Sequence, residues 1–110
     1  MTRRSPLALA LAAALPALSL AVSAPASAAS ETYQTYCAVC HGDDGKAQTE
    51  KGKEKGARDF TNAKWQKAAT DERIESSILK GKGKMPKFEG KLSDADVKAL
   101  VQEVRSFAGH

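Results

Sequence analysis

The sequence predicts a single small all-α domain, and three observations lead to this fold class. Apolar residues recur at helical spacing near the end of the chain, from Val97 to Val104. No segment shows the sustained apolar–polar alternation that is typical of a β-strand. A length of 110 residues, without a visible internal repeat, allows one domain.

The N-terminal segment has the three parts of a secretory signal peptide. Arg3 and Arg4 form a basic start, residues 7–22 are largely apolar, and Ala26-Ser27-Ala28 offers small residues for cleavage. An uncleaved membrane anchor is the alternative, but these 16 residues are fewer than the ~20 that usually cross a bilayer. We therefore predict a signal peptide over residues 1–28, a domain over residues 29–110 and a location in the periplasm.

Charge and composition limit which partners the protein can bind and what can stabilise its core. The chain carries 17 basic and 13 acidic residues, a net charge of +4, which falls to +2 without Arg3 and Arg4. So mild a charge does not predict nucleic-acid binding, and any partner preference must come from local clusters. The mature chain has few large apolar side chains, and its two cysteines exclude a framework of several disulfides. We therefore expect a large cofactor to complete the core.

The first predicted helix runs from Ser30 to Cys40, with Ser30 as its N-cap. Tyr33, Cys37 and Cys40 follow helical spacing and share one face of it. Residues 46–58 are rich in lysine, glutamate and glycine and have almost no apolar side chains, so they predict a solvated loop.

Two isolated aromatic residues, Phe60 and Trp65, follow this loop, and we expect both to be buried because the core is so small. Thr70 is the expected N-cap of a second helix, which ends at Gly81. The composition of residues 81–88 predicts an irregular loop.

The closing helix has the clearest pattern. Ser93 is its expected N-cap, and Asp96 stands three residues later as an aspartate variant of the capping box. An apolar stripe at helical spacing then predicts the buried face: Val97, Leu100, Val101, Val104 and Ala108.

The pentapeptide Cys37-Ala38-Val39-Cys40-His41 is a C-x-x-C-H motif, which is typical of covalent attachment of a c-type haem. Two thiols three residues apart on a helix lie on one side. They can therefore add to the two vinyl groups along one edge of a porphyrin, while His41 supplies an axial nitrogen to the iron.

Three other uses of this cysteine pair are less consistent with the sequence. A redox-active dithiol is expected in a βαβ setting, and no strand is predicted. A disulfide between Cys37 and Cys40 would close a very small loop and stabilise little. A zinc site needs further ligands, and the other histidine, His110, is the last residue.

Met85 is the candidate for the second axial ligand. It is the one methionine of the mature chain, and it lies 44 residues after His41 in a glycine-rich loop, not in an apolar stripe. Thioether ligation would raise the haem potential and fill the open position of the iron. The alternatives are that Met85 fills a gap in the core, or that the terminal His110 is the ligand instead.

With these motifs in this order, the mature chain resembles the class I c-type cytochromes of the short bacterial periplasmic kind. The resemblance implies a cytochrome c fold, in which roughly three to five short helices wrap round one covalently bound haem and the first and last helices cross near-perpendicularly. That crossing would bring Tyr33 or Tyr36 against the stripe of the closing helix. The resemblance also implies His41 and Met85 as axial ligands.

The resemblance suggests two further residues that bind the cofactor, and it has one departure. Trp65 resembles the aromatic residue whose indole N–H binds a haem propionate, with plain core packing as the alternative. Arg58 could pair with a propionate or remain exposed. The family often has a proline after the motif, whose carbonyl accepts the N–H of the axial histidine, and none lies between His41 and Pro86. We expect another carbonyl, near Gly56, to orient His41.

An iron with both axial positions filled has no free site for oxygen or peroxide, so we predict outer-sphere electron transfer by a carrier that is not an enzyme. Two alternatives need a labile Met85: a haem-based gas sensor and a weak peroxidase. A third alternative is that the chain is a subunit of a larger respiratory complex.

A group of lysines surrounds Met85 in the sequence: Lys80, Lys82, Lys84, Lys87 and Lys91. If they surround the exposed haem edge, they would steer the protein onto an acidic face of redox partner proteins. The alternative is that they only make the loop soluble. We expect a monomer without a membrane span in the mature chain.

Overall fold

The computed structural model describes residues 2–3, 14, 16 and 28–110 of the chain. The predicted signal peptide therefore lies almost entirely outside the described residues, and the predicted cleavage site stays a prediction. None of the helices in the described part is long and apolar enough to cross a membrane.

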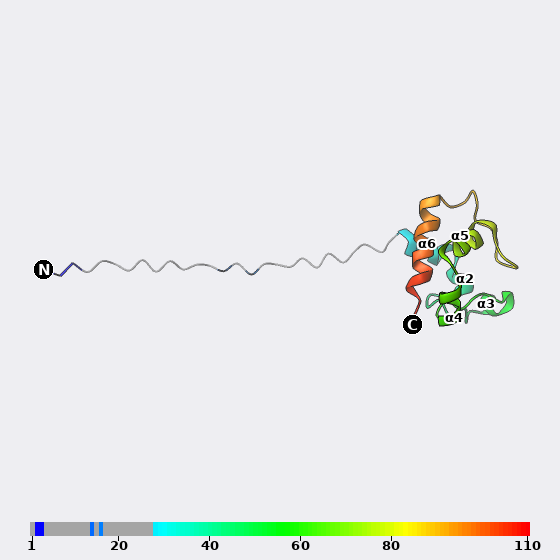
Figure 1. Ribbon diagram of the computed structural model, residues 1–110, viewed down its shortest axis with the longest axis horizontal. Coiled ribbons are helices and arrows are strands. Elements are labelled where there is room, and N and C mark those ends of the chain that lie inside the picture. The colour runs from blue at the N-terminus through cyan, green and yellow to red at the C-terminus, as the bar shows by residue number, and fades with distance from the viewer. Residues whose placement is uncertain (1, 4–13, 15, 17–27) are drawn as a thin grey trace.

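The described part is helical and contains no strand, which confirms the all-α prediction (Figure 1). Two isolated bridges, Lys82 with Met85 and Glu89 with Leu92, are its only β-type pairings. Its helices are α1 (Ala28–Tyr36), α2 (Ala38–His41), α3 (Glu50–Lys55), α4 (Ala63–Ala68), α5 (Asp71–Lys80) and α6 (Asp94–Ser106).

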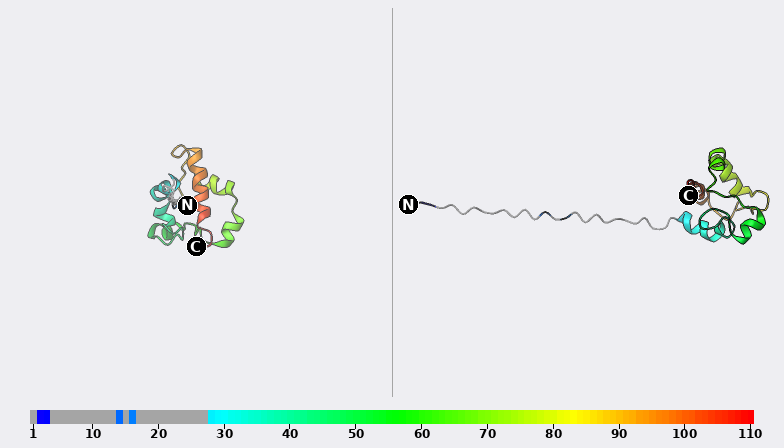
Figure 2. Two further views of the ribbon diagram at one scale, coloured as in Figure 1. Left: turned by 90° about the vertical axis from the view of Figure 1, so that its left-hand side faces the viewer. Right: turned by 90° about the horizontal axis from the view of Figure 1, so that it is seen from below.

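The first and last helices, α1 and α6, pack against each other, as the resemblance implied. Helix α6 also packs against α5, and α2 packs against α3. In the left-hand view of Figure 2, α6 lies between residues 28–58 on one side and α4 and α5 on the other. The closing helix is therefore the element that joins the two halves of the domain.

The first predicted helix is interrupted, and its predicted cap is wrong. The structure begins α1 at Ala28, so Ser30 lies inside the helix and is not its N-cap. The helix breaks at Cys37, which has φ −108° and ψ −39°. The backbone N–H of Cys37 still donates to the Tyr33 carbonyl (2.8 Å), and that of His41 to the Cys37 carbonyl (2.9 Å). Because helical hydrogen bonding continues across the break, the motif keeps its helical register.

The loop predicted over residues 46–58 contains a short helix, α3. The Thr49 side chain accepts a hydrogen bond from the Gly52 N–H, and Gly56 ends the helix in a left-handed conformation (φ 64°). A Cβ atom at Gly52 would stand 2.2 Å from the Cys40 carbonyl oxygen, so only glycine lets α3 approach α2 this closely. Helix α3, which has no apolar face, therefore packs directly on the segment that carries the haem motif.

The two later helices begin as predicted. The Thr70 side chain caps α5 by accepting from the Arg73 N–H, and Gly81 is the C-cap of α5. At the start of α6, Ser93 and Asp96 form the complete capping box. The apolar faces of both helices are buried, through Ile74 and Ile78 in α5 and Val97, Leu100, Val101 and Val104 in α6.

The core gathers these faces round three aromatic residues. Tyr33, Phe60 and Phe88 are buried in one cluster with the apolar residues of α5 and α6. Of the two tyrosines that could meet α6, it is therefore Tyr33 that is buried with its stripe, whereas Tyr36 remains 44% exposed. Phe60 is buried as predicted, and Trp65 is only half-buried at the edge of the cluster.

Candidate functional site

The two cysteines of the motif are free, partly buried thiols at the junction of α1 and α2. Cys37 packs against the core cluster, whereas Val39, between the cysteines, is 54% exposed. Burial raises the pKa of the Cys37 thiol to about 11, and the neighbouring Cys40 adds to the rise. In the haem-free chain, Cys37 is therefore a protonated thiol at neutral pH.

His41 is buried, with its ring held by one hydrogen bond. Its Nδ1 atom lies 2.9 Å from the Arg58 carbonyl oxygen. A carbonyl oxygen only accepts hydrogen bonds, so Nδ1 must carry the proton and Nε2 keeps its lone pair. Burial lowers the pKa of His41, and the hydrogen bond to Arg58 opposes this with a smaller effect. The imidazole is therefore neutral, with Nε2 available to bind a metal.

The carbonyl that orients His41 belongs to Arg58, two residues beyond the expected position near Gly56. Sequence reasoning considered Arg58 for its side chain and missed this main-chain role, because a carbonyl carries no mark of residue type. The Arg58 guanidinium itself is exposed, and its Cζ atom lies 6.0 Å from the centre of the Trp65 ring. Arg58 and Trp65 are therefore neighbours beside the site.

Aromatic side chains pack beside His41. The Phe60 ring stacks on the imidazole with 4.2 Å between centroids and 15° between planes. The Trp65 ring lies 5.4 Å from the Phe60 ring, and the ring of Phe107, directly after α6, lies 6.1 Å from it. The stacking of Phe60 on His41 has no signal in the sequence, since the two residues are 19 positions apart.

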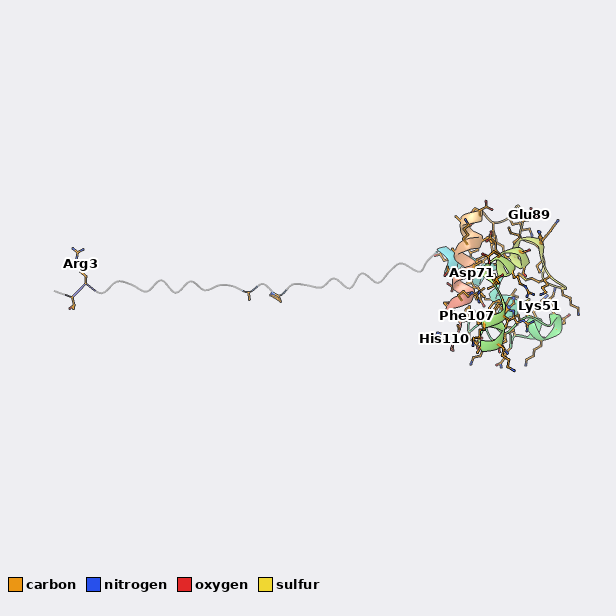
Figure 3. All side chains as sticks on the ribbon, viewed as in Figure 1. Arg3, Lys51, Asp71, Glu89, Phe107 and His110 are labelled. Atoms are coloured by element: carbon orange, nitrogen blue, oxygen red, sulfur yellow. The ribbon has the colours of Figure 1, made fainter. Side chains whose placement is uncertain are left out.

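Met85 lies at the end of a tight turn. The Lys82 N–H donates to the Met85 carbonyl (3.2 Å), and the Met85 N–H donates to the Lys82 carbonyl (2.9 Å). The Met85 side chain is partly buried and packs against the core cluster, as do Cys37 and Trp65. The structure thus brings three of the predicted site residues to one cluster, whereas His110 is exposed beyond the end of α6 (Figure 3).

The lysine-rich loop is held next to the motif by an aromatic contact. The Phe88 ring meets Tyr36, the residue before Cys37, in an edge-on contact at 5.7 Å between centroids. Phe88 is also fixed to α5, because its N–H donates to the Ile78 carbonyl (3.0 Å). Four lysines on this side are exposed: Lys80, Lys82, Lys84 and Lys87.

Comparison with known proteins assigns the family. The family described as "Cytochrome C oxidase, cbb3-type, subunit III" matches residues 24–102. The chain belongs to this family of c-type cytochrome domains. Covalently bound haem c, with its iron, is the cofactor of such a domain, so the cofactor predicted from the motif is confirmed.

The curated relatives of this cytochrome are much longer than the chain itself. The FixPc subunit of a cbb3-type cytochrome c oxidase from Rhizobium leguminosarum bv. viciae is 38% identical over 85 residues, which cover 76% of this chain and 28% of that protein. The FixP subunit from Bradyrhizobium diazoefficiens is 34% identical over 74 residues, 66% of this chain and 24% of that one. The chain thus spans about a quarter of the length of these relatives.

A solved structure of similar size supports the same fold. The KustC0563 c-type cytochrome is 42% identical, with a TM-score of 0.69 over 73% of this chain and 96% of that chain. A mutant of the same protein, in which a tyrosine is replaced by phenylalanine, aligns with a TM-score of 0.67 and 41% identity. The cytochrome c fold predicted from the resemblance is therefore confirmed.

The side chains of this c-type cytochrome fit a covalent haem. The motif offers two free thiols in helical register, and His41 offers an unprotonated Nε2 atom at a buried position. No group of three or more His, Cys, Asp and Glu residues that could hold a metal ion occurs in the described part of the chain, so the zinc alternative finds no ligand set there.

Proposed function

We propose that this cytochrome is a periplasmic carrier of single electrons, with haem c attached through Cys37 and Cys40 and with His41 and Met85 as axial ligands. The observation that carries the proposal is the hydrogen bond from His41 Nδ1 to the Arg58 carbonyl, because it fixes the tautomer that leaves Nε2 free. The packing of Met85 against the same cluster as Cys37 supports the second ligand.

The chain's own residues then have defined tasks. The bound haem supplies a metal centre that gains and loses one electron. His41, oriented by Arg58 and buried against Phe60, would hold the iron and help to exclude water from it. Met85 as a second ligand would raise the potential and would occupy the position that a gas or peroxide needs. A six-coordinate iron therefore favours a carrier over a sensor or a peroxidase.

Trp65 and Arg58 are the proposed partners of the haem propionates. The support is that the two side chains are neighbours, with the Arg58 guanidinium over the indole ring. The hydrogen bond from His41 to the Arg58 carbonyl also supports a position of this residue near the proposed haem site. A guanidinium and an indole N–H are both suitable donors to carboxylates.

Lys80, Lys82, Lys84 and Lys87 are the proposed docking residues for an acidic redox partner. They are exposed, and the one ion pair among the described residues, Arg105 with Asp71, does not involve them. The contact between Phe88 and Tyr36 keeps their loop next to the motif, where the haem edge would be exposed. Lysines outside ion pairs at such an edge would speed association with an acidic face.

A second candidate function is that of a haem subunit in a respiratory complex. The relatives named as cbb3-type oxidase subunits favour it, whereas KustC0563 is named as a c-type cytochrome and is equally compatible with a carrier. Size-exclusion chromatography of the native protein from periplasmic extracts separates the two. Elution as a monomer supports the carrier, and stable co-elution with membrane-complex subunits supports the second candidate.

Optical spectroscopy of the periplasmically expressed protein tests the haem and its ligands. A sharp reduced α-band that survives denaturation, with no shift under carbon monoxide, supports covalent haem with Met85 bound. Met85→Ala should then bind carbon monoxide at once, and His110→Ala should not. An immediate shift in the unsubstituted protein would contradict the carrier and favour a sensor or a peroxidase.

A further inference from the structure

The segment from Arg58 to Phe60 makes two contacts with His41, one hydrogen bond and one ring stack. The Arg58 carbonyl accepts from Nδ1, and two residues later the Phe60 ring lies nearly parallel to the imidazole. The hydrogen bond fixes one point at the edge of the ring. A stacked neighbour limits rotation about the Cβ–Cγ bond, so the two contacts together fix the plane of the imidazole.

The main-chain groups of Phe60 are held by partners that are distant in the sequence. Its N–H donates to the Gly45 carbonyl (2.8 Å), in the turn that follows the motif. Its carbonyl accepts from Gln66 Nε2 (2.7 Å). The same Nε2 donates to the Val104 carbonyl (2.9 Å) in the last turn of α6. Phe60 is therefore fixed between the motif and the closing helix.

Arg105 holds Gln66 in this position. Its Nη1 atom donates to both the main-chain carbonyl (2.7 Å) and the side-chain oxygen (3.0 Å) of Gln66. The remaining guanidinium nitrogens donate to the Ala69 carbonyl and to Asp71 Oδ1. Because the amide oxygen of Gln66 is bound to Arg105, its Nε2 must face Phe60 and Val104. Figure 3 shows Asp71 and Phe107 beside this end of α6.

We propose that Phe60 is a positioning residue for the axial imidazole, and that Gln66 and Arg105 hold it, so that the end of α6 controls the plane of His41. The inference rests on the proposed role of His41 as an iron ligand. A well-aligned Nδ1–H···O=C bond makes an imidazole a more basic ligand. A more basic ligand favours ferric over ferrous iron, so this packing keeps the reduction potential lower than it would be with a loose ring.

Ordinary core packing would account for the burial of Phe60 but not for this arrangement. Phe88 is as buried as Phe60, at 6% against 7% exposure, and its aromatic contact is to Tyr36 instead of His41. The main-chain groups of both phenylalanines are hydrogen-bonded, but a ring that only fills space does not need to lie parallel to the imidazole, as Phe60 does. Phe88 is therefore the matched control.

The test compares Phe60→Leu with Phe88→Leu in the reduced holoprotein. Hydrogen exchange of the His41 Nδ1–H, followed by ¹⁵N NMR, should be about two- to tenfold faster in Phe60→Leu, the range expected from losing one aromatic pair. Its midpoint potential should also rise. Phe88→Leu should lose similar stability in urea while the His41 exchange rate stays unchanged.

Gln66→Met provides the second variant, because it keeps the side-chain length and removes both donors while leaving the ring in place. It should change the exchange rate and the potential in the same direction as Phe60→Leu, and the double variant should change them by less than the sum. The inference would be overturned if Gln66→Met kept the exchange rate and the midpoint potential of the unsubstituted protein. It would also be overturned if Phe60→Leu and Phe88→Leu changed the His41 exchange rate equally. An unsubstituted protein without haem, or without a histidine-ligated iron, would instead overturn the proposed function together with this inference.

Discussion

Tyr33 shows how a single side chain links α1 to the end of the haem motif. Its hydroxyl donates to the Gly42 carbonyl (2.6 Å), and the side chain is 1% exposed. Burial is the main reason that the pKa of Tyr33 rises above its ordinary range, so the phenol remains a donor. Tyr33→Phe removes this bond, although the Gly42 carbonyl still accepts from the Gly45 N–H (3.1 Å), and it should cost about 0.5–1.5 kcal/mol of unfolding free energy in urea. Tyr36→Phe, at a side chain that is 44% exposed, should cost less than ~0.5 kcal/mol. Equal losses in the two variants would contradict this role.

Gly81 is the residue that shapes the loop carrying Met85. It has φ 75°, and a Cβ atom there would stand 2.6 Å from the Met85 carbonyl oxygen. Gly81→Ala must therefore move the Met85 main chain, and it should cost about 1–3 kcal/mol of unfolding free energy. It should also give the reduced protein measurable carbon monoxide binding. Gly83→Ala is the control in the same turn, because its φ is 56° but its Cβ would meet nothing within 4 Å. If Gly83→Ala binds carbon monoxide equally well, close packing at Gly81 is not what fixes Met85.

Residue type and spacing could predict some of the site but not all of it. The spacing of Cys37, Cys40 and His41 was enough to predict the cofactor, because the chemistry of attachment needs those side chains at those positions. The Arg58 carbonyl could not be predicted, because every residue has a carbonyl and only the fold decides which one meets His41. The stacking of Phe60 was missed for the same reason, although its burial was expected from its size. The roles of Met85, Trp65 and Arg58 toward the haem stay predictions.

At the scale of elements, the capping box is what starts α6 at Ser93. The Ser93 hydroxyl accepts from the Asp96 N–H (3.1 Å), and Asp96 accepts from the Ser93 N–H (3.2 Å). Ser93→Ala removes the first of these bonds and should lower the unfolding free energy by about 1 kcal/mol. Ser93→Thr keeps a hydroxyl and should lose only a few tenths. Thermal unfolding followed by circular dichroism measures both, and a Thr variant as unstable as the Ala variant would contradict the role of the hydroxyl.

The helices that were predicted well from the sequence have both an N-cap residue and an apolar stripe. The helices that were missed have an N-cap residue alone. Both α5 and α6 combine an N-cap with an apolar stripe, so cap and period agree on where each helix lies. Helix α3 has the cap Thr49 but buries only Gly52, and α4 has the cap Asn62 but buries no residue fully. Helices of six residues are marginal in water and depend on tertiary contacts. Close packing of α3 on α2 is such a contact, and it is not visible in the sequence.

At the scale of the whole molecule, the fold class followed from the sequence, but the arrangement of the helices did not. The lack of alternation predicted an all-α domain, and a small core predicted a cofactor. The packing of α1 on α6 was expected only through the resemblance, because contacts between the two ends of a chain leave no periodic pattern. The hydrogen bonds of Gln66 and Arg105, which join α4 to α6, were not expected at all.

The distribution of charge over the molecule gives the last prediction, since a net charge this small says little about partners. Ferricyanide is a suitable probe of the field at the haem edge, because it is an anion that oxidises the reduced protein directly. Replacing Lys82, Lys84 and Lys87 by Gln should slow this oxidation by roughly tenfold at low ionic strength, within the range of electrostatic steering. The effect should fade as salt shortens the Debye length to about 10 Å at 0.1 M.

The control replaces three exposed lysines of α4 and α6 by Gln, namely Lys64, Lys67 and Lys98, so it removes the same charge elsewhere. If ferricyanide oxidises the two triple variants equally slowly, only net charge matters. An oxidation rate that does not depend on salt in the unsubstituted protein would contradict steering by this loop.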